Sequence, residues 1–246
     1  MFTDTHAHIS IHDNIQKIIL NAENLNVKKI INNGCDYQSN QNILEISSKY
    51  KNIYSAIGIH PQNLNDYQEK YLDHIIKNME KIVAIGEIGL DYYNGHENRE
   101  FQKEIFIKQL ELAERYNKPV IIHSREATQD TIKILKKFPK VKGSIHCFSG
   151  SYETALEYIK MGYVLGINGV VTFKNSNLYK VIEKIPLENI ILETDSPYLT
   201  PEPYRGKTNE PAFTYYVAKK ISEIKTISIE EVSKITESNV KRVFDI

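Results

Sequence analysis

Two histidines close to the start of the chain, His6 and His8, have the residue type and the spacing of a metal-binding pair. They end a short apolar-to-polar run that begins at Phe2 and predicts a β-strand. On an extended backbone alternate side chains project from the same face, so both imidazoles can reach one point. Imidazole is a common ligand of divalent transition metals. A His-x-His pair alone is a weak signal, because a working metal site needs further ligands from elsewhere in the chain.

Potential ligands also stand where other predicted strands end. Short apolar and β-branched runs predict strands near residues Phe2–His6, Lys29–Asn33, Ile53–Ile59, Ile82–Ile88, Pro119–His123, Gly143–Cys147, Tyr163–Ile167 and Asn189–Glu193. The side chains at or just beyond the ends of six of these strands are His6 and His8, His60, Glu87, His123, His146 and Asp195. Five of the eight histidines in the sequence therefore fall at strand ends, whereas chance would scatter them over helices and loops.

Helical patterns separate these strands and define the expected fold. They lie near residues Asn14–Leu25, Gln38–Lys49, Asp66–Asn78, Asn98–Tyr116, Glu126–Lys137, Tyr152–Met161, Ser176–Ile185, Pro211–Glu223 and Ser228–Val243. Strands that alternate with helices pair in parallel through right-handed crossovers, and about eight such units predict a (β/α)8 barrel of the α/β class. An open doubly wound sheet is the alternative, but its typical GxGxxG turn does not follow the first strand. No linker or composition break divides residues 1–246, so we expect a single domain.

In such a barrel the carboxyl ends of the strands form one face, where catalytic residues collect. Four imidazoles and two carboxylates on that face form a mixed nitrogen and oxygen donor set suited to Zn, Mn, Ni or Fe. Six ligands exceed what one tetrahedral catalytic ion with an open position uses, and they suffice for two ions. Our hypothesis assigns His6, His8 and Asp195 to one ion, His123 and His146 to the other, and Glu87 to both as a bridge.

A two-ion centre indicates hydrolytic chemistry. The ions lower the pKa of the water between them, so that hydroxide forms at neutral pH, and they hold the attacking and leaving oxygens of a displacement. Asp195 is placed to accept a proton from that water as general base, while Glu87 links the two ions. We therefore expect Asp195 and Glu87 to be the catalytic carboxylates.

The overall composition restricts the class of protein and its compartment. Lys plus Arg and Asp plus Glu both number 31, so the formal net charge is zero, which disfavours a protein that holds long duplex nucleic acid by charge. A nuclease that grips only a strand end is still allowed. The two cysteines, Cys35 and Cys147, form neither a CxxC pair nor a disulfide framework, which indicates a reducing compartment. We find no signal-like start and no apolar run of membrane-spanning length, and we expect a cytoplasmic protein.

Seven short motifs, in order along almost the whole chain, resemble those of one known family. They are Thr5-His6-Ala7-His8, Gly58-Ile59-His60-Pro61, Gly86-Glu87-Ile88-Gly89-Leu90-Asp91, Ile122-His123-Ser124-Arg125, His146-Cys147-Phe148-Ser149-Gly150, Glu193-Thr194-Asp195-Ser196-Pro197 and Arg205-Gly206-Lys207-Thr208-Asn209-Glu210-Pro211. Each motif is weak by itself, but the ordered set is similar to the TatD family of metal-dependent deoxyribonucleases, within the amidohydrolase-like barrels. The acidic and small residues that usually precede the family's His-x-His are also present, as Asp4 and Thr5.

The resemblance implies a metal-dependent hydrolase that cleaves DNA phosphodiester bonds from a 3′ end. It implies two divalent ions per subunit, Zn, Mg, Mn or Ni, held by the residues that match the family's ligands: His6, His8, Glu87, His123, His146 and Asp195. The expected partner is DNA at single-stranded ends, with no membrane and no obligatory protein partner.

Four residues near the expected centre are candidates for binding substrate: His60, Arg125, Ser149 and Arg205. Three have a simpler reading: His60 as a loop histidine, Arg125 as a surface salt bridge and Arg205 as part of a solvated loop. Ser149 lies in a turn before a helix, where its hydroxyl and the backbone amides could hold a phosphate. Tyr92 and Tyr93 can stack on a base or merely pack. Three acidic residues, Asp4, Asp91 and Glu193, can support the ligands without binding metal or can serve structure alone. Asp4 would do so as a hydrogen-bond acceptor that orients His6.

Two other classes of function fit parts of the sequence. A binuclear-metal amidase, lactonase or esterase that acts on a small molecule needs the same ligands but no phosphate contacts. A nucleic-acid-binding or scaffold protein that keeps the barrel without turnover does not need all six ligands, so their presence disfavours that class.

Overall fold

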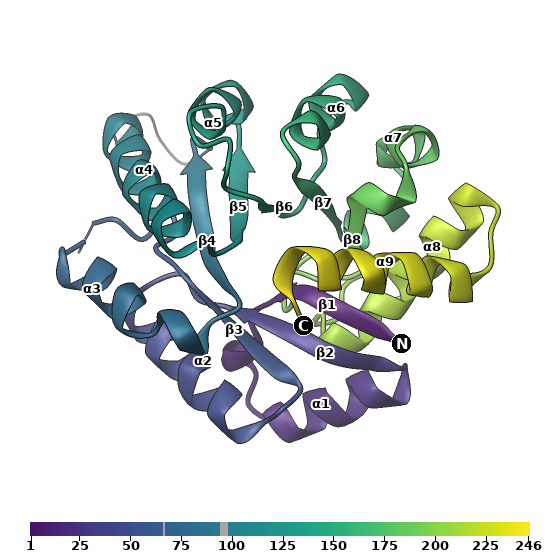
Figure 1. The fold of residues 1–246 in the computed structure, drawn as a ribbon. Helices are drawn as coiled ribbons and strands as arrows, with labels where there is room; N and C mark the ends of the chain where they lie inside the picture. The colour runs from purple at the N-terminus through teal and green to yellow at the C-terminus, as the bar shows by residue number, and fades with distance from the viewer. Residues whose placement is uncertain (66, 94–97) are drawn as a thin grey trace.

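The computed structural model of this protein describes residues 1–65, 67–93 and 98–246. Its centre is a sheet of parallel strands whose spatial order, β1 to β8, is also their order in the chain. The strands are β1 Phe2–Ala7, β2 Val27–Asn33, β3 Ile53–Ile57, β4 Ala84–Asp91, β5 Val120–Arg125, β6 Gly143–Ile145, β7 Val164–Ile167 and β8 Ile190–Leu192. Figure 1 shows them curled into a barrel with helices outside, which confirms the predicted (β/α)8 architecture.

Helices connect the strands and cover the outside of the barrel. The α-helices are α1 Ile15–Asn24, α2 Tyr37–Lys49, α3 Lys70–Lys77, α4 Arg99–Tyr116, α5 Thr128–Leu135, α6 Tyr152–Lys160, α7 Leu178–Lys184, α8 Thr214–Lys225 and α9 Ile229–Phe244. Short 3₁₀ helices are η1 Ile9–Ile11, η2 Met79–Lys81, η3 Gly169–Thr172, η4 Leu187–Asn189 and η5 Pro211–Phe213. Within the described residues, we find no helix with the length and apolar character needed to cross a membrane.

The observed bounds differ from the predicted ones where polar residues continue a strand. Strands β4 and β5 run past their predicted ends, because Asp91 and Arg125 still pair with each other across the sheet. Both side chains therefore stand on strands at the mouth of the barrel. Helix α3 begins at Lys70, later than its predicted start at Asp66, which lies outside the described residues.

Polar contacts close the barrel between its first and last strands. Ala7 pairs in parallel with Ser196, and the Asp195 N–H donates to the His6 carbonyl at 2.9 Å. Asp4 is fully buried beside this seam. Its carboxylate accepts from the Thr194 N–H at 2.9 Å and the Thr194 hydroxyl at 2.6 Å. Two candidate metal ligands, His6 and Asp195, thus lie on the segments that this seam joins.

The contacts of Asp4 differ from the expected role of orienting the His6 ring. Asp4 lies inside β1, and its carboxylate accepts from the His6 backbone N–H at 3.3 Å. The Nδ1 atom of His6 has no hydrogen-bond partner among the described residues. Asp4 therefore acts through the backbone, by fastening the carboxyl end of β8 to β1.

The opposite end of the barrel is apolar and is covered by α9. Side chains from successive strands form an inner cluster with two residues of α9: Ile31, Ala56, Ala84, Ile121, Val164, Ile191, Val240 and Phe244. Figure 1 shows α9 crossing the barrel near the amino-terminal ends of the strands. The Asn239 side-chain amide donates to the carbonyls of Leu187 and Ile190 at 2.9 and 2.7 Å. Burial of this cluster stabilises the end of the barrel that lies away from the candidate ligands.

We expect Asp4→Ala to lower the free energy of unfolding by about 3 kcal/mol, because buried Thr194 and His6 donors lose their acceptor. Urea denaturation measures this change. The matched control is Asp73→Ala, at an exposed position of α3, which should change stability by less than about 0.5 kcal/mol. Equal stability of the two variants would show that the seam does not depend on Asp4.

Candidate metal centre

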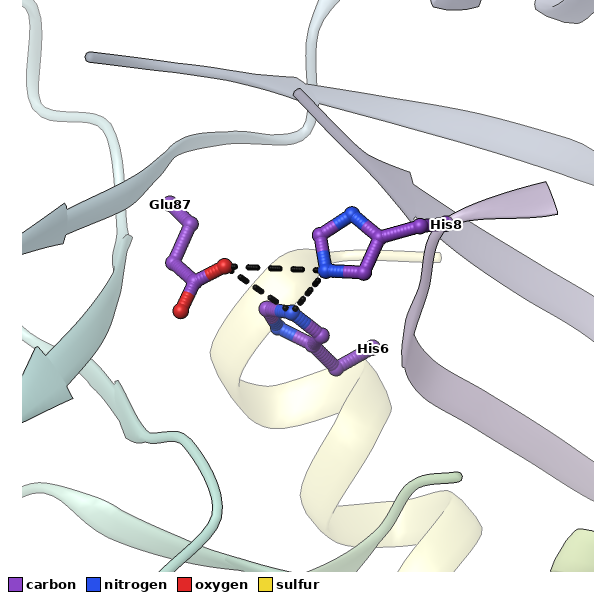
Figure 2. Close-up of side chains that lie close together, drawn as sticks. All are labelled: His6, His8 and Glu87. Atoms are coloured by element: carbon purple, nitrogen blue, oxygen red, sulfur yellow. Dashed lines mark hydrogen bonds and ion pairs between the residues drawn. The ribbon is translucent and has the colours of Figure 1, made fainter. Parts of the chain in front are cut away.

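The first pair of histidines converges with Glu87 at the carboxyl ends of the strands. The Nε2 atoms of His6 and His8 are 3.2 Å apart, and both rings point toward the Glu87 carboxylate (Figure 2). Glu87 Oε2 lies 3.3 Å from His6 Nε2 and 3.7 Å from His8 Nε2. Asp195 Oδ1 lies 3.8 and 3.6 Å from the same two nitrogens. The alternation of side chains along β1 therefore brings the His-x-His pair to one point, as predicted from the spacing.

The second pair of histidines faces the other oxygen of Glu87. Glu87 Oε1 lies 2.8 Å from His123 Nδ1 and 3.8 Å from His146 Nε2. Asp195 Oδ1 is 3.7 Å from His146 Nε2. The Glu87 carboxylate thus stands between the two histidine pairs, which is the arrangement that a bridging ligand requires.

Two of these imidazoles, His8 and His123, are held from behind by a hydrogen-bond acceptor, and His146 has a carboxylate behind it. His8 Nδ1 is 2.9 Å from the Asn33 carbonyl oxygen, and His146 Nδ1 is 3.1 Å from Glu193 Oε1. His123 Nε2 is 3.0 Å from Asp91 Oδ2. An acceptor on the outward nitrogen orients an imidazole and leaves its inward nitrogen free to bind metal.

His60 has the opposite tautomer. The Gln62 N–H donates to His60 Nδ1 at 3.1 Å, so Nε2 carries the hydrogen in the neutral ring. Burial lowers the pKa of His60 to about 3, which keeps the ring neutral. Its Nε2 faces Glu87 Oε1 at 3.6 Å. His60 thus offers a hydrogen-bond donor to the cavity, whereas a metal ligand needs a free lone pair.

The two central carboxylates are ionised at neutral pH. Burial by itself would raise the pKa of Glu87, but the surrounding histidines more than offset that cost and hold the pKa well below its usual range. The same balance between burial and the neighbouring His146 and His8 lowers the pKa of Asp195. Both groups therefore present negative oxygens to the centre.

The protonation of the histidines follows from their carboxylate neighbours. Burial lowers the pKa of His6 and opposes protonation there. Burial also disfavours the charged form of His146, but Glu193, Asp195 and Glu87 overcome it and raise the pKa to about 9. In the protein without metal, a proton on His146 supplies part of the positive charge that these carboxylates need.

The donor set fits divalent metal ions. The nitrogens of His6 and His8 face each other at 3.2 Å and both approach the same carboxylate oxygen, so a cation there would satisfy all three atoms. Among the described residues, every ion pair of Glu87 and Asp195 is with a histidine and none is with Lys or Arg. Neutral imidazole and carboxylate are the ligands expected for Zn, Mn or Ni.

The centre opens into a cavity of about 660 Å³, called here the central cavity. Three of the four predicted substrate-binding residues, His60, Arg125 and Ser149, line it. The Arg125 guanidinium lies 3.6 Å from the ring centroid of Tyr93, and no ion pair with a described residue engages it, so the alternative of a surface salt bridge is not observed. Tyr92, in contrast, is buried and its hydroxyl donates to Asp130 at 2.8 Å, so this ring packs.

The fourth predicted residue, Arg205, does not line the central cavity. Its guanidinium donates to the Thr200 carbonyl at 2.9 Å and lies 4.0 Å from the ring centroid of Phe173. These contacts hold Arg205 within the loop after β8 and away from the ligands.

Several residues of the central cavity did not stand out in the sequence. Gln62 donates to Asp91 at 2.7 Å, and Cys35 Sγ lies 3.9 Å from Glu87 Oε2. Tyr198 lines the cavity and is 56% exposed. Gln62 and Tyr198 follow the quoted Gly58–Pro61 and Glu193–Pro197 motifs closely, and this proximity was the only available signal.

Comparison with known proteins agrees with the geometry. A family model described as TatD related DNase matches residues 3–245. The chain belongs to the TatD family. YabD of Bacillus subtilis (strain 168), named an uncharacterized metal-dependent hydrolase, is 42% identical over an alignment that covers 100% of both proteins. Membership of this family makes the chain a metal-dependent hydrolase, which confirms the predicted family and general reaction class.

Solved structures of TatD proteins have the same fold. The crystal structure of the TatD homologue YjjV from Escherichia coli K12 matches with a TM-score of 0.95 and 29% identity, over 100% of this chain and 98% of that chain. A TatD family hydrolase from Entamoeba histolytica matches with a TM-score of 0.86 and 26% identity, over 99% and 97% of the two chains. The candidate metal centre thus lies on a barrel typical of the TatD family.

The assigned tautomers predict that His123 binds metal and that His60 donates a hydrogen bond instead. The metal content of variants tests this assignment. We expect His123→Ala to reduce the bound divalent metal by about one ion per chain, because its inward nitrogen is lost. His60→Ala should leave the metal content unchanged while slowing turnover, since its Nε2 carries a hydrogen. Elemental analysis of the purified variants gives the stoichiometry. Loss of metal from the His60 variant would contradict the assigned tautomer.

Proposed function

We propose that this TatD-family hydrolase cleaves DNA phosphodiester bonds as a 3′–5′ exonuclease, with residues 1–246 forming one catalytic domain and two divalent ions bound by the candidate centre. The observation that carries the proposal is the position of Arg125. Its exposed guanidinium lines the same cavity as the carboxylate and imidazole cluster and lies on the ring of Tyr93. A guanidinium beside a metal centre is suited to bind phosphate oxygens.

The proposed roles follow from the contacts of each side chain. Divalent ions at this centre would supply Lewis-acid activation of water and of the phosphate. Asp195, with a lowered pKa, is ionised and can accept the proton of the attacking water. His60 donates from Nε2, and Arg125 donates from its guanidinium, to the phosphate oxygens. Glu87 holds the two halves of the centre together between both histidine pairs.

Exposed aromatic rings near the centre support a nucleic-acid substrate. Tyr198 lines the central cavity and Tyr93 lies under Arg125, and both are 56% exposed. Exposed rings can stack on the bases of a single strand without regard to sequence. The zero net charge of the chain fits capture of a strand end by local contacts rather than by a long basic groove. We further propose a cytoplasmic location, which the two free thiols, Cys35 and Cys147, support.

We expect purified, chelator-treated protein to shorten end-labelled single-stranded DNA only after Mg, Mn or Zn is added back. Asp195→Asn should lower kcat by about 100-fold or more, because the proton acceptor is lost. Glu87→Ala should lower both activity and metal content. Gel electrophoresis of the products shows the shortening and, from the labelled end, its direction.

Two results would contradict the nuclease. A wild-type rate of DNA cleavage by Asp195→Asn would show that Asp195 has no catalytic role. Absence of cleavage with every metal, despite bound ions, would favour a hydrolase that acts on amides, lactones or esters of small molecules, and panels of such substrates would then be assayed.

Arg125 has its own test. We expect Arg125→Ala to raise KM for DNA by about tenfold or more, because a charge-assisted contact to phosphate is lost. Arg125→Lys should recover only part of the affinity, since lysine lacks the planar fork. The matched control is Arg115→Ala, at an exposed position of α4, which should leave KM unchanged. An equal KM for the Arg125 variant and wild type would exclude the phosphate contact.

A further inference from the structure

A second, smaller cavity of about 270 Å³ adjoins the central cavity and is called here the side cavity. It lies between the ends of β5 and β6, beneath the first turns of α5 and α6. The residues that line both cavities are Ser124, Arg125, His146, Cys147 and Ser149. The two cavities therefore meet beside Arg125 and a candidate metal ligand, His146. A ligand anchored at the metal centre can extend into the side cavity.

The charges around the side cavity do not suit a second phosphate. Apart from His146, its charged lining residues are Arg125 and Glu126, which are adjacent in the chain and opposite in sign. A phosphate placed there would meet the Glu126 carboxylate as well as the guanidinium. A neutral group with hydrogen-bonding atoms avoids that repulsion. The charge of a bound phosphate ester is thus better placed at the metal centre, with its neutral part in the side cavity.

The inner wall of the side cavity combines apolar surface with a buried hydroxyl. Ile145 and Phe148 are buried there, and Tyr158 is only 1% exposed. The Tyr158 hydroxyl makes no hydrogen bond to a described residue. The Ser124 hydroxyl, which offsets part of the rise in the pKa of Tyr158 caused by burial, lies 3.0 Å from the Thr131 hydroxyl. The Tyr158 hydroxyl is closed off behind the wall, so the wall offers a bound ligand its apolar surface.

We propose that the side cavity binds the terminal nucleoside of the DNA strand, with the base against its apolar wall and the scissile phosphate at the metal centre. This inference rests on the proposed nuclease function and names the part of the substrate that the side cavity recognises. A heterocyclic base is neutral and planar, so it can pack against the apolar wall without bringing a negative charge to Glu126. The volume of about 270 Å³ suits a single nucleoside, so the cavity selects the end of a strand.

Binding of two phosphate esters tests this proposal apart from catalysis. The probes are thymidine 5′-monophosphate and 2-deoxyribose 5-phosphate, which differ only in the base, titrated calorimetrically into Mn-loaded protein. We expect the nucleotide to bind at least about tenfold more tightly to the wild type, because only the nucleotide fills the side cavity.

Variants of α6 locate the effect. Thr154→Phe places a ring in the side cavity and should bring the nucleotide affinity down to that of the sugar phosphate, whose own affinity stays within about twofold. Glu153→Phe adds the same ring at the neighbouring exposed position outside the cavity and should change neither affinity.

The outcomes distinguish this proposal from the proposed function. Equal affinities of the two probes for a wild-type protein that cleaves DNA would overturn the nucleoside site and leave the nuclease intact. Unchanged nucleotide affinity in Thr154→Phe would also overturn the site. If the protein cleaves no DNA and binds neither probe, the proposed function fails and the nucleoside site fails with it.

Discussion

The buried carboxylate of Glu87 is the constraint on which the rest of this structure depends. An ionised carboxylate that is 3% exposed is tolerated only when positive charge and hydrogen-bond donors surround it. The barrel supplies those partners from separate strands: His6 from β1, His8 from just beyond it, His123 from β5 and His146 from just beyond β6. Divalent ions would meet the same requirement more fully than protons on imidazole, so metal binding and the stability of the barrel mouth are coupled.

Contacts on the side of each histidine ring that faces away from the centre give these histidines different proposed functions. The acceptors behind His8 and His123 leave their inward nitrogens free, and the Glu193 carboxylate lies behind His146 at ion-pair distance. The N–H of Gln62 behind His60 instead places a hydrogen on its inward nitrogen. The proposed role of each imidazole, as ligand or as donor, thus follows from the single group on the far side of its ring.

Much of the site could be predicted from the sequence because parallel strands in a barrel end on one face. His6, His146 and the other ligands stand at strand ends, and this rule needs no knowledge of the loops. The positions of Arg205 and Tyr198 depend on the path of the long loop after β8, which strand periodicity does not determine. The sequence allowed Asp4 either to orient His6 or to serve structure alone, and its partners include the backbone and hydroxyl donors of Thr194, just beyond β8 and far away in the sequence. Long-range partners of this kind follow from tertiary packing and have no local pattern.

The helix that covers the amino-terminal ends of the strands has a kinetic consequence. Val240 and Phe244 of α9 pack into the apolar cluster there, so the barrel is closed at one end and a polymer cannot thread through it. In the nuclease proposed above, substrate and product would share one entrance, and each product would leave before the shortened strand advanced. Such a nuclease would be distributive unless the strand were retained from outside. Its processivity would be set by the loops around the mouth, which can vary without any change to the chemistry beneath them.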